Sequence, residues 1–138
     1  MEVVAILVVI AATFAYRVVQ DVGRALNPRA IRSQVQGGVV QGLGYALHDE
    51  ITINPDGAFD QRGFETYLLP MAEDVVSVDI DLFEGAPSAG LLGTKGAGEV
   101  PILNVGAAVA CAVANAIGKP VSRLPLTPPK VLALLTGR

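Results

Sequence analysis

The sequence predicts an α+β domain of two layers, in which helices pack on a mixed sheet. Helical and strand-like patterns occur together along the chain without a strict β-α-β alternation, which favours this class. Of the 138 residues, 51% are hydrophobic, which supplies a core and argues against intrinsic disorder. The length fits one domain or a part of a larger protein.

The N-terminal segment, residues 1–16, is dominated by an almost wholly apolar run over residues 3–15. This run is shorter than the roughly 20 residues that span a bilayer. It also lacks the positively charged leader of a signal peptide. Its valines and isoleucines favour a buried strand. We expect a cytoplasmic chain, with a membrane or export role left open by residues 3–15.

A helix is predicted from Pro28 to Leu47. Asn27 suits its N-cap, and proline suits the first helical position. Apolar residues recur every four positions on one face. They are Ile31, Val35, Val39, Leu43 and Leu47.

A neighbouring face of this helix carries Gln34 and four glycines, at positions 37, 38, 42 and 44. Each glycine inside a helix costs about 1 kcal/mol relative to alanine, so something must approach this face closely. The approaching group is either a neighbouring helix or a ligand that the Gln34 amide binds by hydrogen bonds.

The middle of the chain predicts strands and a turn. Residues 54–57, Asn-Pro-Asp-Gly, form a turn signal between the flanks of a hairpin. Residues 66–70 predict a short strand that ends at a proline. Apolar and polar residues alternate over 76–82, which predicts a half-buried strand. We expect Asp79 and Asp81 to solvate its outer face.

Two more helices are predicted after this strand. One runs from Pro101 to Ile117 and ends at Gly118. It carries Cys111, the only cysteine of the chain, which we expect to be buried as a small apolar residue. A short third helix runs from Thr127-Pro128 to Gly137.

Charge and metal-ligating residues restrict the classes of partner. Only 17% of residues are charged, below the roughly 25% that is usual, which suggests a surface covered by a partner subunit. The net charge of −3 without a basic cluster argues against nucleic acid. With one cysteine and one histidine, His48, the chain has no Cys/His set for zinc or an iron–sulfur cluster.

The run from Gly93 to Pro101 is the most informative stretch. Its glycines allow a tight turn and a close approach to a bound group. It ends in a single carboxylate, Glu99, directly before a helix start. Glu99 is therefore either a catalytic base or the polar cap of a loop-to-helix junction.

Six short motifs follow one another along the chain. They are DVGRALNP (21–28), QVQGG (34–38), QGLG (41–44), YLLP (67–70), GTKGAGEVP (93–101) and LPLTP (124–128). Together they resemble the C-terminal part of the molybdenum-binding subunit of the xanthine dehydrogenase/aldehyde oxidase family. The resemblance covers residues 17–138, which we therefore expect to form a partial molybdopterin-binding domain. Residues 1–16 do not match the family pattern.

The resemblance implies a role for particular residues. Glu99 matches the family's general base, which serves the hydroxylation of an aldehyde or an N-heterocycle. Gln34 matches a glutamine that binds the pterin, and Gly96, Ala97 and Gly98 match a loop close to the metal. The implied cofactor is molybdenum–molybdopterin, including its cytosine dinucleotide form, with no direct protein ligand to the metal from this chain.

The resemblance also implies partners, because the family's subunit is several times longer. Its other cofactor-contacting loops lie upstream, and iron–sulfur and FAD groups lie on other domains or subunits. We therefore expect an oxidoreductase that is active only with a chain supplying the rest of the site. Two alternatives stay open. One is a non-catalytic remnant or interaction domain that forms a homo-oligomer, and the other is an unrelated module that binds an anion at the helix start near Pro101.

Overall fold

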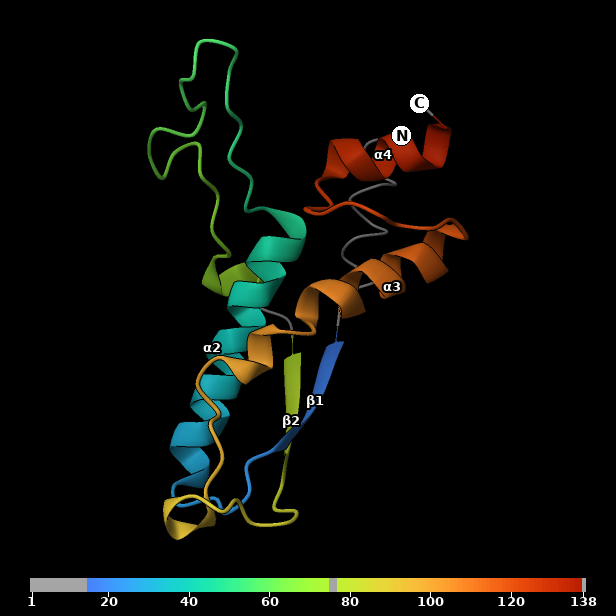
Figure 1. Cartoon of the computed structure of the whole chain (residues 1–138). Helices are drawn as coiled ribbons and strands as arrows, with labels where there is room; N and C mark the ends of the chain where they lie inside the picture. Colours follow the sequence, from blue (N-terminus) through green and yellow to red (C-terminus); the bar gives the residue numbers. More distant parts are fainter. Residues whose placement is uncertain (1–14, 75–76, 138) are drawn as a thin grey trace.

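The computed structural model describes residues 15–74 and 77–137 (Figure 1). Within these described residues, two strands, β1 (Ala15–Asp21) and β2 (Ser77–Phe83), combine with three α-helices and three short 3₁₀ helices. The α-helices are α2 (Pro28–Leu47), α3 (Val105–Ile117) and α4 (Pro128–Thr136). The 3₁₀ helices are η1 (Ala72–Asp74), η2 (Leu91–Gly93) and η3 (Val100–Ile102). The strand expected within residues 3–15 lies, apart from Ala15, outside the described residues.

The two strands form one layer and α2 the other. β1 pairs with β2 in parallel, with a register that runs from Ala15 opposite Ser77 to Asp21 opposite Phe83. Figure 1 shows α2 lying along this pair of strands, with α3 and α4 beyond one end of the sheet. The α+β class is therefore confirmed. The described part of the sheet consists of two parallel strands rather than a mixed set.

The predicted apolar stripe of α2 forms the centre of the core. Val35 and Val39 are fully buried there, and Leu43 is nearly so. They pack with valines from α3 and with residues around α4 in one cluster. The other members of this cluster with almost no exposed surface are Ala46, Val105, Val109, Val113, Leu126 and Val131. This cluster fixes α2, and with it the position of Gln34.

Three of the predicted helix ends follow the sequence, whereas Thr127 precedes α4 without a side-chain capping bond. The Asn27 side chain accepts a hydrogen bond from the amide of Ala30 at 3.0 Å, as an N-cap should. α3 and α4 end at Gly118 and Gly137, which adopt left-handed φ angles of 66° and 70°. At these two positions a glycine ends the helix without steric cost.

The predicted helix from Pro101 is wrong at its start. The amides of Ile102 and Leu103 bond to carbonyls three residues earlier, Glu99 and Val100, which makes η3 a separate 3₁₀ turn. The α-helix begins only at Val105, after Asn104. The glycine loop therefore leads into a 3₁₀ turn and not into a long helix.

Two other local predictions also need correction. The amides of Thr66 and Tyr67 both bond to the carbonyl of Gly63, at 3.0 and 2.9 Å, so residues 66–70 begin as a turn and not a strand. The expected hairpin is reduced to a tight turn with a single bridge between Ile53 and Phe59. Short strands with few partners cannot hold a ladder, which explains both differences.

Much of α3 is uncovered. The stretch Val100–Ile117 has a mean hydropathy of 1.9 and is long and apolar enough to cross a membrane by length and composition, yet only 22% of it is buried. Cys111 is exposed on this helix, so the prediction that it is buried was wrong. The fully buried residues of α3 are every fourth one, Val105, Val109 and Val113, and the small residues between them are half-buried or exposed.

Candidate functional site

The predicted site residues meet where α2 passes the glycine loop. The Gln34 side-chain amide nitrogen donates a hydrogen bond to the carbonyl oxygen of Gly98 at 3.1 Å. The two residues are 64 positions apart in the chain, and both are exposed. The contact places Gln34 and the Gly96–Gly98 loop side by side at one surface.

The glycines of α2 differ in what lies against them, and Gly44 faces Asp49 and Pro70, whose nearest atoms would lie 3.0 and 3.1 Å from an added Cβ. A Cβ added at Gly38 would lie 2.9 Å from the Cβ of Pro101, and one at Gly42 would lie 2.5 Å from the Cβ of Val105. These two glycines therefore allow η3 and α3 to pack closely on α2. A Cβ at Gly37 would meet no atom of the described residues within 4 Å. Packing against a neighbouring element thus accounts for part of the glycine face and leaves Gly37, next to Gln34, open.

The loop before Glu99 is equally open. Added Cβ atoms at Gly96 and Gly98 would meet no atom within 4 Å in the part of the chain that the structure describes, and both residues are exposed. Ala97 between them is half-buried. Because glycine leaves the backbone uncovered, the amides and carbonyls of this loop are accessible to a bound group.

Glu99 lies directly before η3 and is exposed. Its side chain makes no capping hydrogen bond to this turn. The structure therefore does not support a capping role for Glu99. η3 has only three residues, too few to build the dipole that the anion-binding alternative near Pro101 requires.

The start of the glycine loop is fixed by the segment that follows β1. The Asp21 carboxylate accepts hydrogen bonds from the amide of Gly23 at 3.0 Å and from the Lys95 ammonium at 2.6 Å. These bonds, first that from Lys95 and then that from the Gly23 amide, lower the pKa of Asp21. Sequence reasoning did not single out Asp21 or Lys95, although both lie inside motifs that carried the resemblance.

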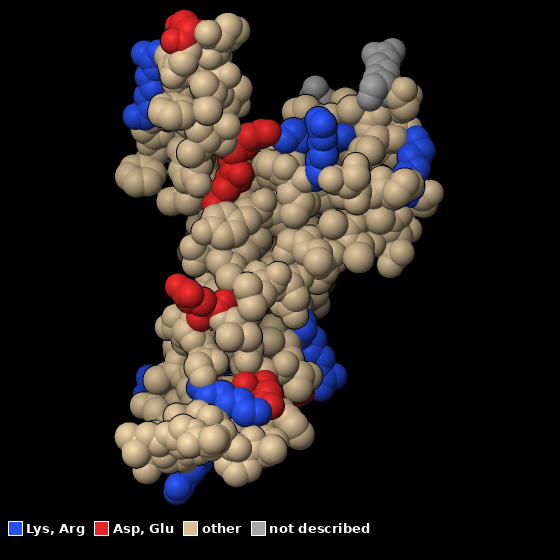
Figure 2. Space-filling view, in the orientation of Figure 1, with Lys and Arg blue, Asp and Glu red and all other residues tan. Residues whose placement is uncertain are grey.

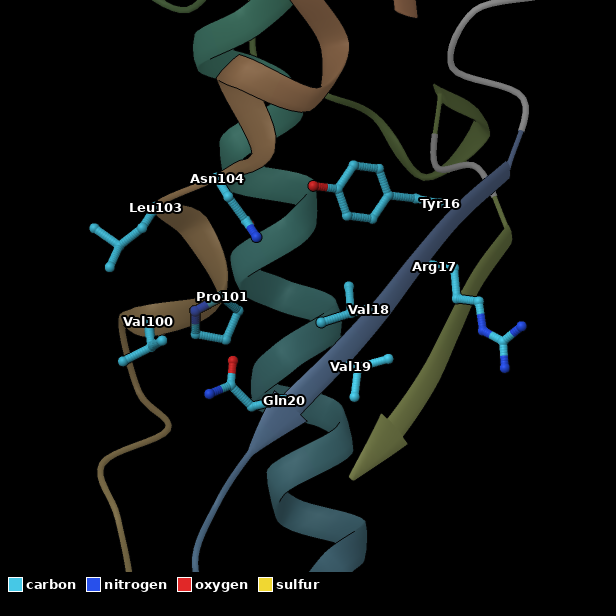
Figure 3. A pocket seen from close by; sticks show the side chains of 9 residues that line it. All are labelled: Tyr16, Arg17, Val18, Val19, Gln20, Val100, Pro101, Leu103 and Asn104. Atoms are coloured by element: carbon cyan, nitrogen blue, oxygen red, sulfur yellow. The ribbon is translucent and has the colours of Figure 1, made fainter. Parts of the chain in front are cut away.

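A cavity of about 310 Å³ lies between β1 and η3 (Figure 3). Gln20, at 8% exposure, points from β1 into this region, and its amide donates to the carbonyl of Asp21 at 3.1 Å. The cavity borders Val100, the residue after Glu99. It is lined by Tyr16, Arg17, Val18, Val19, Gln20, Val100, Pro101, Leu103 and Asn104. The alternation of β1 predicts that Gln20 shares a face with Val18, but nothing in the sequence singles it out as buried.

Charged residues elsewhere have structural roles. Asp79 and Asp81 pair with Arg17 on the exposed face of the sheet at 3.6 and 2.8 Å, in keeping with a solvated strand face. Among residues 15–74 and 77–137 no group of three His, Cys, Asp or Glu side chains is placed to hold a metal ion. Figure 2 shows a face on which charged side chains are sparse between large neutral areas.

The family model of the molybdopterin cofactor-binding domain matches residues 11–76. The chain is 39% identical, over 85% of its length, to 6-hydroxypseudooxynicotine dehydrogenase complex subunit gamma from Paenarthrobacter nicotinovorans. It is 34% identical, over 82% of its length, to the xanthine dehydrogenase molybdenum-binding subunit of Escherichia coli O157:H7. The chain spans about 15% of the length of each of these relatives.

The fold gives the same result. The crystal structure of quinoline 2-oxidoreductase from Pseudomonas putida 86 superimposes with a TM-score of 0.81 and 27% identity. The match covers 88% of this chain and 16% of that protein. The chain belongs to the xanthine dehydrogenase/aldehyde oxidase family of molybdenum hydroxylases and corresponds to part of their molybdenum-binding subunit.

Proposed function

We propose that this chain forms one wall of a molybdopterin site and supplies the general base of a hydroxylase that a second chain completes. The observation that carries the proposal is the hydrogen bond from Gln34 to the carbonyl of Gly98. It joins the glutamine and the loop that the family resemblance assigns to the cofactor. The proposed substrate class is an aldehyde or an N-heterocycle with an electron-poor carbon.

The residues at this surface fit a pterin. Gly37, Gly96 and Gly98 leave open space where any side chain would project, so a flat group can approach the backbone. Gln34 uses one donor on Gly98 and keeps its amide oxygen and second N–H for polar edges of a ligand. Gln34, Gly96, Ala97 and Gly98 would hold the cofactor, which when bound supplies the redox chemistry of the hydroxylation.

The proposed role of Glu99 is to accept a proton at its carboxylate. Its side chain is exposed and makes no capping bond, so its oxygens are available to a reacting group. A general base must lie within hydrogen-bond reach of the proton it takes. Gly98 and Pro101, which contact α2 on either side of Glu99, fix the backbone from which the carboxylate projects.

The chain requires partners to enclose this site. Several large apolar side chains are exposed, among them Leu91 at 86%, Phe64 at 82% and Leu103 at 77%. We propose that a chain with the upstream part of the molybdenum-binding subunit covers such surfaces. We propose that iron–sulfur and flavin groups lie on other domains or subunits, as the family resemblance implies, and a single cysteine cannot ligate an iron–sulfur cluster here.

The test is purification of the tagged chain from its native host. Stoichiometric molybdenum and a co-purifying partner with the upstream motifs are expected, and the released pterin shows whether a cytosine nucleotide is attached. A metal-free chain without such a partner would refute the proposal. A metal-free homodimer would instead favour a non-catalytic interaction domain, the alternative that the exposed apolar residues also support.

A further inference from the structure

The loop that carries Glu99 is held at both of its ends. Its start lies against residues that follow β1, and its end lies against α2. Within this loop, Cβ atoms added at Gly96 and Gly98 would meet no atom of residues 15–74 and 77–137 within 4 Å. The loop therefore has little packing of its own, and its conformation depends on the anchors.

The first anchor is a short antiparallel pairing of residues 22–24 with 93–95. The amide of Arg24 donates to the carbonyl of Gly93, and the amide of Lys95 donates to the carbonyl of Val22, both at 3.0 Å. Gly23, with φ of +60°, forms a bridge with Thr94, and a Cβ there would clash with the Gly93 carbonyl. Only glycine permits this close pairing.

Asp21 connects the two sides of this pairing. One carboxylate oxygen accepts the amide of Gly23 on its own side, and the other accepts the ammonium of Lys95 on the loop side. A charge-assisted bond of this length is of the stronger kind. Lys95 is followed directly by Gly96, so the ion pair acts on the first residue of the open loop.

The second anchor lies at the far end. The Gln34 amide holds the carbonyl of Gly98, and Gly38 lets Pro101 pack directly on α2. Only Gly96 and Ala97 lie between the Lys95 and Gly98 contacts. The conformations open to Gly96 and Ala97, which lead to the peptide that precedes Glu99, therefore depend on where Lys95 is held.

We propose that Asp21 is a positioning residue for Glu99, acting through Lys95 and the Gly96–Gly98 loop. The inference rests on the proposed function, because a positioning role for Asp21 requires that Glu99 is the base. An exposed ion pair alone stabilises little, and the Asp21 and Lys95 side chains are 41% and 35% exposed. What distinguishes this pair is its place on the loop.

The test compares Asp21→Asn with Asp81→Asn in the full chain. Asp81→Asn is a matched control, because it breaks another exposed ion pair, with Arg17 at 2.8 Å, on the same sheet. For Asp21→Asn we expect roughly two- to fivefold faster amide exchange at Arg24 and Lys95 and lower backbone order parameters over 96–98. Lys95→Met should reproduce this effect, and Lys95→Arg should restore wild-type exchange. Unchanged exchange in Asp21→Asn, or an equal change in Asp81→Asn, would overturn the proposal.

A second measurement, in the purified complex, separates positioning from stability. Asp21→Asn should lower kcat with little change in KM and in molybdenum content, while Asp81→Asn should leave all three unchanged. An unaffected kcat with a loosened loop would refute the positioning role. Failure of the proposed function would give a different result. Full activity of Glu99→Gln would exclude Glu99 as the base, but it would not alter the faster amide exchange expected for Asp21→Asn.

Discussion

Replacing Gly42 or Gly37 of α2 with alanine tests the division of the glycine face in a single helix. Both changes gain the same intrinsic helix propensity, about 0.5–1 kcal/mol. At Gly37 the new methyl group meets open space, so we expect a gain in stability of this size. At Gly42 it would lie 2.5 Å from the Cβ of Val105, a fully buried residue that cannot move aside freely.

The difference between the two variants isolates the packing term, because the propensity terms cancel. Overpacking of this kind costs about 1–3 kcal/mol, so Gly42→Ala should be less stable than Gly37→Ala by that amount. With a urea m-value of about 2 kcal/mol per M, the midpoints differ by roughly 0.5–1.5 M. Urea unfolding followed by far-UV circular dichroism measures them. If Gly42→Ala were as stable as Gly37→Ala, the close packing of α3 on α2 would be refuted.

Three further substitutions test the N-cap of α2, the buried carboxyl of Asp49 and the pairing of Gly23 with the glycine loop. Asn27→Ala removes the cap bond of α2 and should cost about 1 kcal/mol, seen as a lower Tm, and an unchanged Tm would contradict it. Burial raises the pKa of Asp49, despite the opposing effects of His48 and Tyr67. The stabilisation that the protonated Asp49 carboxyl gives the folded state is therefore complete below the unfolded-state pKa, and it is lost as pH rises through the folded-state pKa. Asp49→Asn should reduce that decline in a Tm-against-pH profile, and identical profiles would exclude this cause. Gly23→Ala should destabilise by about 2–4 kcal/mol in urea, since it combines a positive φ with a clash, and a midpoint like that of the wild type would argue against the pairing at the loop.

The sequence predicted best those elements whose signals are local. The Asn27 cap, the stripe of α2 and the glycine at the end of α4 each depend on neighbours within a few residues, and all are present. The strand expected over 66–70 failed because no described partner strand pairs with it. A strand needs partners distant in the sequence, which a local pattern does not contain.

In the candidate site, too, local patterns predicted some residues, and only the fold shows the contacts between them. Residue type and local pattern singled out Gln34 and Glu99. Because these residues are 65 positions apart, the sequence does not show that Gln34 contacts the loop next to Glu99. The Asp21–Lys95 ion pair spans 74 positions and carries no local signal. Cys111 was predicted to be buried because free cysteine behaves as a small apolar residue in a helix rich in such residues, and only the fold shows which side of that helix faces the core.

The most direct measurement of the central claim is turnover by the molybdenum-loaded complex with Glu99→Gln. Glutamine keeps the size of the side chain and removes the proton-accepting carboxylate. Glu73→Gln, at an exposed residue of η1, is the control for loss of one surface carboxylate. We expect Glu99→Gln to abolish turnover with molybdenum and pterin content unchanged, while Glu73→Gln is fully active. Substantial turnover by the loaded Glu99→Gln complex would contradict the assignment of Glu99 as the base.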